Sequence, residues 1–195
     1  MQQEVLSNFF LVGGTALSLQ IGHRISVDLD LFTQQDFDTK KTLNILNTIF
    51  EIQNYTENTD TLNFNIKFPE KSDNIIKIDL IKYSYPLINP IIYVDDIRLL
   101  SVQDIIPMKL SAIAGRGSKK DFYDIYYLLK NYTFMQMFGY FEKKFPNANK
   151  FHVLKSLEYF ADAELEPDPK TLEKSDWKKI KQTIIKETNK FIKIL

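Results

Sequence analysis

The organisation of this chain can be inferred outward from FFLVGGTALSLQIGHRISVDLDLFT, residues 9–33. A short apolar run, Phe9–Val12, leads into a glycine pair, and a helical pattern opens at Thr15. Residues 25–33 (ISVDLDLFT) then alternate apolar and polar side chains and are rich in Val, Ile and Leu. The stretch therefore predicts a strand, a glycine turn, a helix and a second strand.

Paired carboxylates are the second feature of this stretch. Side chains two residues apart on a strand point to the same face, so Asp28 and Asp30 are expected to project together. A later strand candidate, IIKIDLIKY, carries Asp79 on the face opposite Ile78 and Leu80. If the two strands are neighbours, three carboxylates meet at one place.

Carboxylates that meet in this way repel one another, and they either change their pKa values or bind a cation. Mg²⁺ suits such a site because it takes hard oxygen ligands and shares its coordination sphere with phosphates; Mn²⁺ is the alternative. Two such ions support phosphoryl or nucleotidyl transfer. Gly13 and Gly14 lack Cβ atoms, so their backbone can approach a triphosphate, and the helix that opens at Thr15 adds its N-terminal dipole.

Each of these features has a simpler interpretation when it is taken alone. An Asp-x-Asp pair also occurs on solvated strand edges, a Gly-Gly pair in ordinary tight turns, and a single Asp such as Asp79 on any exposed strand. The order of turn, helix, paired carboxylates and later carboxylate is what favours a site.

The remainder of the chain predicts an α+β fold in which strands precede helices. Asp38 is a plausible N-cap for a helix, and Ser101 is a plausible N-cap for another that runs to about Gly115. We expect a catalytic half with a mixed sheet at residues 1–100 and a helical half at 101–195 that completes the active site. The further strand candidates are Phe50–Thr56, Leu62–Phe68, Ile75–Tyr83 and Ile91–Leu100, and the further helix candidates are residues 119–130, 134–145, 150–161 and 175–194.

Composition limits the class of protein. The 195 residues are 44% hydrophobic, which suffices for one sizeable core or two compact halves. No run of about 18 apolar residues is present, so no membrane span is expected. With no signal-peptide pattern and no cysteine, the expected compartment is the cytoplasm. Residues 1–100 carry 8 basic and 13 acidic side chains and residues 101–195 carry 17 and 12, which suits an acidic half for cations and a basic half for phosphates, although chance also produces such a pattern.

Residues 9–33 resemble the first motif of the AbiEii-type toxin nucleotidyltransferases, a group within the DNA polymerase β-like superfamily. A second resemblance covers residues 101–130 and matches the helical motif of the group, in which a Lys, an Arg and a Lys-Asp-x-x-Asp recur. The positions that match the two motifs are Gly13, Gly14, Thr15, Ala16, Leu17, His23, Arg24, Ser26, Asp28, Asp30, Leu31, Phe32, Lys109, Leu110, Ala112, Arg116, Lys120, Asp121 and Asp124.

The resemblance implies roles for the matching positions, and these are predictions. Asp28 and Asp30 would bind the metal ions, and Asp79 fits a third carboxylate position where the group is less uniform. Lys109 would reach the nucleotide phosphates, and Asp121 would complete the catalytic set. The residues predicted to contact the nucleotide are Gly13, Gly14, Thr15, Arg24, Ser26 and Arg116.

Several of the conspicuous residues also fit structural roles. Arg24 can pair with a carboxylate, His23 fits a hydrogen-bonded structural residue better than a base, and Asp124 fits a supporting salt bridge. The aromatic residues 122–127 fit core packing better than base stacking, and the lysines of residues 178–193 fit a solvated helix face better than an RNA contact.

The function that we predict from the sequence is Mg²⁺-dependent transfer of NMP from an NTP to an acceptor. The acceptor would be RNA, plausibly tRNA, and the enzyme would be the toxin of a toxin–antitoxin or phage-defence system with a cognate antitoxin. Two alternatives remain open at this point. The acceptor could be a protein hydroxyl, as in AMPylation, or the chain could be a catalytically inactive module that binds nucleotides or a partner.

Overall fold

The computed structural model describes residues 1–67 and 75–195, which form two compact units. The first unit comprises Met1–Ala16, Ser26–Tyr85 and Pro90–Leu100, and the second comprises Leu17–Ile25, Pro86–Asn89 and Ser101–Leu195. This grouping differs from a single division at residue 100 because two short segments, residues 17–25 and 86–89, pack with the helices.

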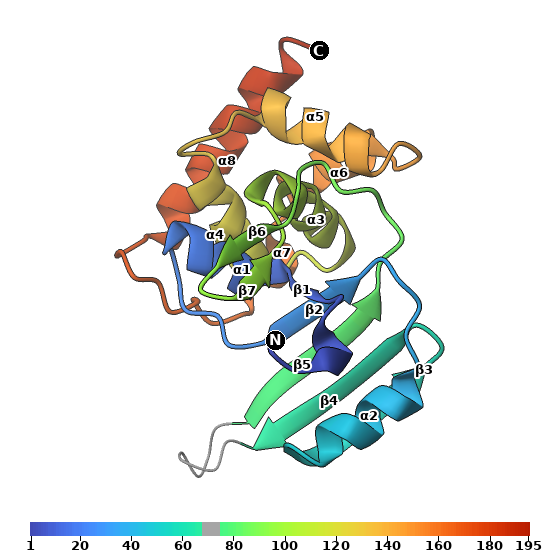
Figure 1. The fold of residues 1–195 in the computed structure, drawn as a ribbon. Coiled ribbons are helices and arrows are strands. Elements are labelled where there is room, and N and C mark those ends of the chain that lie inside the picture. The colour runs from blue at the N-terminus through green and yellow to red at the C-terminus, as the bar shows by residue number, and fades with distance from the viewer. Residues whose placement is uncertain (68–74) are drawn as a thin grey trace. The chain divides into compact units, whose positions relative to one another are not determined.

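A seven-stranded mixed sheet is the centre of the first unit, with the strand order β3-β4-β5-β2-β1-β7-β6 (Figure 1). β2 lies parallel to β5 and antiparallel to β1, and β1 lies parallel to β7. The elements of this unit are a 3-10 turn at Glu4–Leu6, β1 (Phe10–Leu11), the start of α1 (Gly13–Ile21), β2 (Leu29–Thr33), α2 (Thr39–Asn47), β3 (Glu51–Asn58), β4 (Thr61–Lys67), β5 (Ile75–Lys82), β6 (Ile92–Val94) and β7 (Ile97–Leu99).

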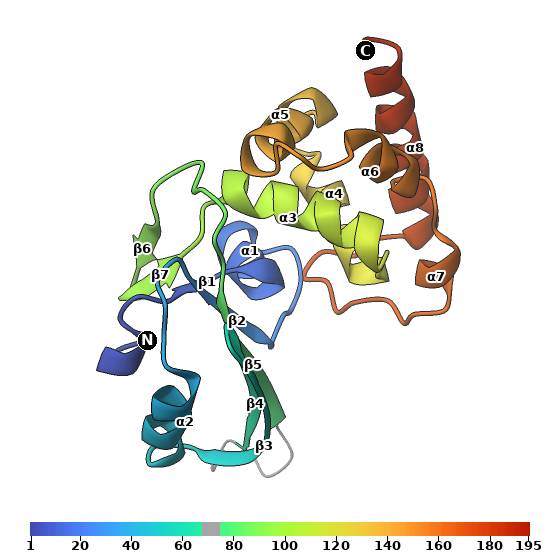
Figure 2. The same ribbon diagram turned by 90° about the vertical axis from the view of Figure 1, so that its right-hand side faces the viewer.

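The two faces of the outer strands differ in polarity. In β4, Leu62, Phe64 and Ile66 are buried, whereas the alternate residues Asn63 and Asn65 are partly exposed. Helix α2 covers the apolar face of β3 and β4, and Figure 2 shows it on one side of these strands. The period-two pattern of the sequence thus gives one face to the core and leaves the other face polar.

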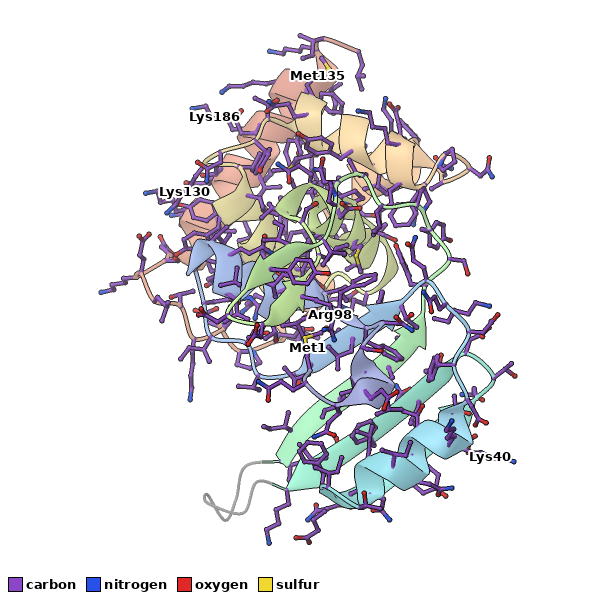
Figure 3. All side chains as sticks on the ribbon, in the orientation of Figure 1. Met1, Lys40, Arg98, Lys130, Met135 and Lys186 are labelled. Carbon is purple, nitrogen blue, oxygen red and sulfur yellow. The ribbon has the colours of Figure 1, made fainter. Side chains whose placement is uncertain are left out.

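Arg98 on β7 holds the N-terminal turn against the sheet. Its guanidinium donates to the carbonyl oxygens of Phe9 at 2.7 Å and Leu6 at 2.6 Å. It also donates to the carbonyl of Met1, toward which its side chain points in Figure 3. These contacts fix the segment that leads into β1 and therefore the position of the glycine turn after it.

The second unit is helical and has an aromatic core. The rings of Tyr123 and Trp177 are stacked, as are those of Phe138 and Phe191. A buried ion pair, Lys144–Asp104 at 2.8 Å, accompanies this core. The helices are the remainder of α1, then α3 (Val102–Gly115), α4 (Lys119–Leu128), α5 (Phe134–Lys144), α6 (Lys150–Ser156), α7 (Ala161–Glu164) and α8 (Trp177–Ile192).

The predicted α+β class, with a mixed sheet followed by helices, is confirmed. The two predicted N-caps are also confirmed, since the side chain of Asp38 accepts from the backbone N–H of Lys41 and that of Ser101 accepts from Asp104. Pro107 lies inside α3, as the sequence requires. Within the described ranges 1–67 and 75–195, none of the helices has the length and apolar character of a membrane span.

Three predicted elements need correction. The strand predicted at residues 25–33 begins only at Leu29, because residues 23–25 pair with residues 170–172 instead. Residues 91–100 form the hairpin β6–β7, since Asp95 and Asp96 adopt positive φ and reverse the chain. The helix predicted at 150–161 is interrupted after Ser156.

The interruption accompanies the packing of Phe160 against the rings of Phe122 and Trp177. Phe68, the last residue of the strand predicted at Leu62–Phe68, lies outside the described residues.

Candidate active site

The glycine turn places the backbone against a carboxylate. Gly13 has φ of +66° and directly follows β1 through Val12, whose N–H donates to the carbonyl of Asp30 at 2.8 Å. A Cβ atom at Gly13 would lie 2.3 Å from Asp30 Oδ2. Glycine is therefore required here both by its left-handed conformation and by the close approach of Asp30.

Asp30 and Asp79 face each other across the parallel ladder of β2 and β5. Residues in register on neighbouring strands project to the same face of a sheet, so the two carboxylates share a face. Asp28 precedes β2 by one residue and is held through its backbone, because its carbonyl accepts a hydrogen bond from the hydroxyl of Thr15. The Thr15 hydroxyl also lies 3.0 Å from Ser26 Oγ.

Lys77 is the cation of this group. Its ammonium donates to Asp79 Oδ2 at 2.5 Å, and about half of its side chain is exposed, 52% against 12% for Asp79. The hydrogen bond to Asp79 raises the pKa of Lys77, and the charges of Asp30 and Asp28 raise it further. One ammonium thus lies in the field of all three predicted metal ligands.

The donor set fits a divalent cation. Asp79 Oδ1 is buried and has no hydrogen-bond partner, and its neighbour Asp30 supplies further hard oxygen atoms. As placed, the residues 1–67 and 75–195 contain no group of three His, Asp or Glu side chains that could hold a metal ion. The three-carboxylate metal site therefore stays a prediction, with Lys77 as the cation that now compensates part of its charge.

A second cluster of charged residues lies in the helical unit and centres on Asp124 of α4. Asp124 is fully buried and accepts hydrogen bonds from both Nε and Nη2 of Arg24, at 2.6 and 3.0 Å. His23 Nε2 lies 2.6 Å from Asp124 Oδ1. Arg24 is held in place by the pairing of residues 23–25 with 170–172.

Lys109 joins Asp124 to the second carboxylate of α4, Asp121. The Lys109 ammonium is 2.7 Å from Asp124 Oδ2 and 3.0 Å from Asp121 Oδ1. Arg116 donates to both oxygens of Asp121, at 2.8 and 3.1 Å, and its side chain is 58% exposed. Arg24, Lys109 and Arg116 thus pair with the two buried carboxylates, and Arg116 is the member of the cluster whose side chain reaches solvent.

Burial and ion pairing act in opposite directions on this cluster. Burial raises the pKa of Asp124, but the charge of Lys109 and the hydrogen bonds from His23 and Arg24 outweigh it, so the pKa lies well below its ordinary value. Burial likewise lowers the pKa of Lys109, and the charges of Asp124 and Asp121 overcome that effect and raise it. Asp124 and Lys109 are therefore both charged at neutral pH.

The predicted site residues fall into two groups. The first unit brings together the glycine turn, Thr15, Ser26 and the carboxylates; the second brings together Lys109, Asp121, Arg24 and Arg116. The structural interpretation of His23 is confirmed, and Asp124 pairs with Lys109, Arg24 and His23. Phe122, Tyr123 and Tyr127 are buried in the core, as packing predicts.

Sequence reasoning did not identify Lys77. Its signal was available, because it precedes Asp79 by two residues on a predicted strand and must share its face. The sequence indicates only weakly that Asp124 lies at the centre of the charged cluster, because its partners Arg24 and Lys109 are distant in the sequence.

Comparisons with known proteins identify the family of this chain and structures with a similar fold. A family model described as "Nucleotidyl transferase AbiEii toxin, Type IV TA system" matches residues 2–194 of the chain. An uncharacterized protein of Aquifex aeolicus (strain VF5) is 35% identical over 165 residues, which cover 82% of this chain and 77% of that protein.

Two solved structures show a similar fold. JHP933 from Helicobacter pylori superposes with a TM-score of 0.57 at 16% sequence identity, covering 95% of this chain and 88% of that one. The nucleotidyltransferase toxin MenT4 of Mycobacterium tuberculosis H37Rv gives a TM-score of 0.54 at 14% identity, covering 93% of this chain and 75% of that one.

Proposed function

The chain belongs to the AbiEii family of nucleotidyltransferase toxins, and we propose that it transfers NMP from an NTP to a hydroxyl of an RNA acceptor, with Mg²⁺ as its cofactor. Membership of this family makes the chain an enzyme of the nucleotidyltransferase type. Our proposal adds the metal, the class of acceptor, the residues that act, a cytoplasmic location and a cognate antitoxin.

One observation supports this proposal above the others. The glycine turn lies against Asp30, and Asp30 lies beside Asp79, whose Oδ1 atom is buried without a partner. Backbone N–H groups without Cβ atoms are suited to phosphate oxygens, and neighbouring carboxylates are suited to the cations that accompany phosphates. The two features that suit a nucleoside triphosphate with its cation, the glycine turn and the Asp30–Asp79 pair, lie within one unit.

We assign the following roles in the reaction. Gly13 and Gly14 would bind the triphosphate through their backbone, and Asp28, Asp30 and Asp79 would hold two Mg²⁺ ions. When bound, Mg²⁺ lowers the pKa of an attacking hydroxyl and neutralises charge on the leaving pyrophosphate. Thr15 fixes the backbone at Asp28, so its hydroxyl would act as a positioning group.

The transfer itself is a displacement at phosphorus. The acceptor oxygen forms a bond to the α-phosphorus, and the bond from that phosphorus to the bridging oxygen breaks. The pyrophosphate would leave with the electron pair, and the hydroxyl proton would pass to water.

Two cations of the cluster around Asp124, Lys109 and Arg116, are the candidates for a phosphate contact. The Lys109 ammonium is buried between two carboxylates, so breaking its contacts to reach a phosphate would be costly. Arg116 is the exposed member of the cluster, and its always-charged guanidinium suits a phosphate. We therefore assign the phosphate contact to Arg116 and a positioning role to Lys109, Arg24 and Asp121.

A labelled-nucleotide assay tests the proposed function. The purified protein is incubated with Mg²⁺, total RNA, total protein extract and each α-³²P-labelled NTP in turn, with Asp30→Ala alongside. We expect label on RNA with the wild type and none with Asp30→Ala. Label on a protein band and none on RNA would show that the acceptor is a protein and not RNA. NTP binding without transfer of label to any acceptor would contradict catalysis.

A further inference from the structure

The face of β3 and β4 that α2 leaves uncovered carries an unusual number of amide side chains. β3 has eight residues and β4 seven, and four of these are Asn: Asn54, Asn58, Asn63 and Asn65. Asn is depleted in strands, because its side chain competes with the backbone for hydrogen bonds. A polar sheet face built only for solubility has no need of so many amides.

The strand register connects these amides to the carboxylates. Asn63 lies opposite Asp79, and Thr56 lies opposite Asn63, so a row of polar side chains crosses four strands from Asp30. At the ordinary strand spacing this row is about 14 Å long.

A second row begins at Lys77, continues with Asn65 opposite it and ends at Asn54. Asn65 Nδ2 donates to Asn54 Oδ1 at 2.7 Å. We call the two rows together, without Asp30 and Asp79, the amide strip. Its members are Asn54, Thr56, Asn63, Asn65 and Lys77.

The amide strip lines a cavity of about 260 Å³ on the polar face, together with Tyr55 and Phe64. The charged residue among these lining positions is Lys77, whose ammonium is paired with Asp79. Amide groups offer donors and acceptors at once, which matches the edges of unpaired nucleobases, and an ammonium matches the phosphate that joins them. A single-stranded nucleic acid meets both conditions.

The geometry of the reaction separates the acceptor from the donor. In an in-line displacement the attacking oxygen and the leaving pyrophosphate lie on opposite sides of the α-phosphorus. The glycine turn, which we assign to the triphosphate, follows β1 on one side of Asp30, whereas the amide strip extends from Asp79 on the other side. A pyrophosphate that leaves toward Gly13 therefore places the attacking hydroxyl on the side of the strip.

We infer that the amide strip binds the single-stranded end of an RNA acceptor and presents its terminal hydroxyl beside Asp79. This inference rests on the proposed function and adds the surface that selects the acceptor. Asn54 and Asn65 contact bases or ribose, and Lys77 contacts the phosphate nearest the reacting end.

A charge introduced on the strip tests the inference. Asn54→Asp places a carboxylate in the cavity, on an exposed position of β3. Asn58→Asp makes the same change four residues further along the same strand, at an exposed position that does not line the cavity. Circular dichroism and thermal melting establish that both variants fold like the wild type.

The probe is a short fluorescein-labelled single-stranded RNA with a free 3′-hydroxyl, and binding is followed by fluorescence anisotropy without NTP. We expect Asn54→Asp to weaken binding about tenfold, through a lost hydrogen bond and a repelled phosphate, and Asn58→Asp to change it less than about twofold. The affinity for an α-³²P-labelled NTP, measured by filter binding, reports separately on the donor site.

Equal RNA affinity in wild type and Asn54→Asp, or no RNA binding by the wild type, would overturn the inference. Unchanged RNA affinity with reduced label on a protein band in Asn54→Asp would assign the strip to a protein acceptor and reject RNA. Failure of the proposed function has a different signature, because the wild type would then transfer no label to any acceptor, while the anisotropy still decides the role of the strip.

Discussion

Asp30 and Asp79 occupy the same register position on the neighbouring parallel strands β2 and β5, and Lys77 binds the second of these carboxylates at 2.5 Å. Two carboxylates on one face, with Asp28 close to the same ammonium, form a concentrated negative charge. A cation is needed to compensate this negative charge. In this structure the cation is the ammonium of Lys77, and in the proposed mechanism it is Mg²⁺.

Removing the ammonium should make the protein more dependent on Mg²⁺. We expect Lys77→Met to lower the Tm in EDTA, and Mg²⁺ to raise the Tm of this variant by about 2–4 °C more than that of wild type, the shift that ~1 kcal/mol gives in a chain of this size. Differential scanning fluorimetry with and without Mg²⁺ measures this. Lys82→Met is the control, because Lys82 lies on the same strand and pairs with Asp36 instead; an equal Mg²⁺ response in all three proteins would contradict the prediction.

Gly13→Ala should abolish transfer, whereas Gly22→Ala should only reduce stability. Both glycines have positive φ, +66° and +61°, so an Ala at either position costs about 1–2 kcal/mol of backbone strain. A Cβ at Gly13 would meet Asp30 Oδ2 at 2.3 Å, whereas one at Gly22 has no atom within 4 Å. Urea unfolding should therefore show a loss of stability in both variants, whereas the label-transfer assay should show a loss of activity in Gly13→Ala and not in Gly22→Ala. Similar transfer activity in the two variants would argue against the role of the turn.

Asp124→Asn should destabilise the helical unit strongly. It leaves Lys109 and Arg24 without their shared buried carboxylate, a change that typically costs about 3–5 kcal/mol. Glu173→Gln, at an exposed carboxylate paired with the exposed Lys130, should cost less than about 1 kcal/mol. Urea unfolding at neutral pH compares the two variants with wild type.

The effect of Asp124 should also depend on pH with a defined sign. Its pKa is lowered in the folded state, so its contribution is complete above the unfolded pKa of about 3.9 and is lost as the pH falls below that value. The stability of the wild type should therefore decline toward that of Asp124→Asn in increasingly acidic solution below about pH 4. If the difference in free energy of unfolding between wild type and Asp124→Asn stayed constant throughout this range, the charge of Asp124 would not be the source of its stabilising effect.

Expression should arrest growth only when the carboxylate pair is intact. We expect induction of the wild type in a bacterial host to slow growth and induction of Asp30→Ala to have no effect, because the proposed metal ligand is lost. Asp36→Ala removes an exposed carboxylate that pairs with Lys82 and should remain toxic. Equal toxicity of wild type and Asp30→Ala, at equal protein levels on an immunoblot, would exclude a metal-dependent cause of the arrest.

Local chemistry explains which parts of this account the sequence could predict. The alternation of Leu62, Phe64 and Ile66 and the cap residues Asp38 and Ser101 depend on neighbours within a few positions, so β4 and two helices could be predicted. The same alternation predicts Asp28 and Asp30 on one face, but β2 begins at Leu29, so of the two only Asp30 lies on the strand. The meeting of Asp30 with Asp79 required only that β2 and β5 be adjacent, which the structure shows.

Features that depend on distant partners could not be predicted in this way. The strand expected from Ile25 is shortened because residues 23–25 pair with residues 170–172. Arg24 and His23 share Asp124, about a hundred residues away, so their pairing has no local pattern. The hairpin at Asp95-Asp96 depends on two positive φ angles that Asp adopts less readily than Asn or Gly.

The most direct measurement of the central claim is label transfer from an α-³²P-labelled NTP to total RNA by the purified protein, with Mg²⁺ and with EDTA, for wild type and Asp30→Asn. Asp30→Asn keeps the size of the side chain and removes a carboxylate beside Asp79 that we propose as a metal ligand. We predict transfer by the wild type with Mg²⁺, none with EDTA, and a loss of about 100-fold or more in the variant. Equal transfer in EDTA, or by Asp30→Asn, would contradict a reaction at the Asp30–Asp79 pair.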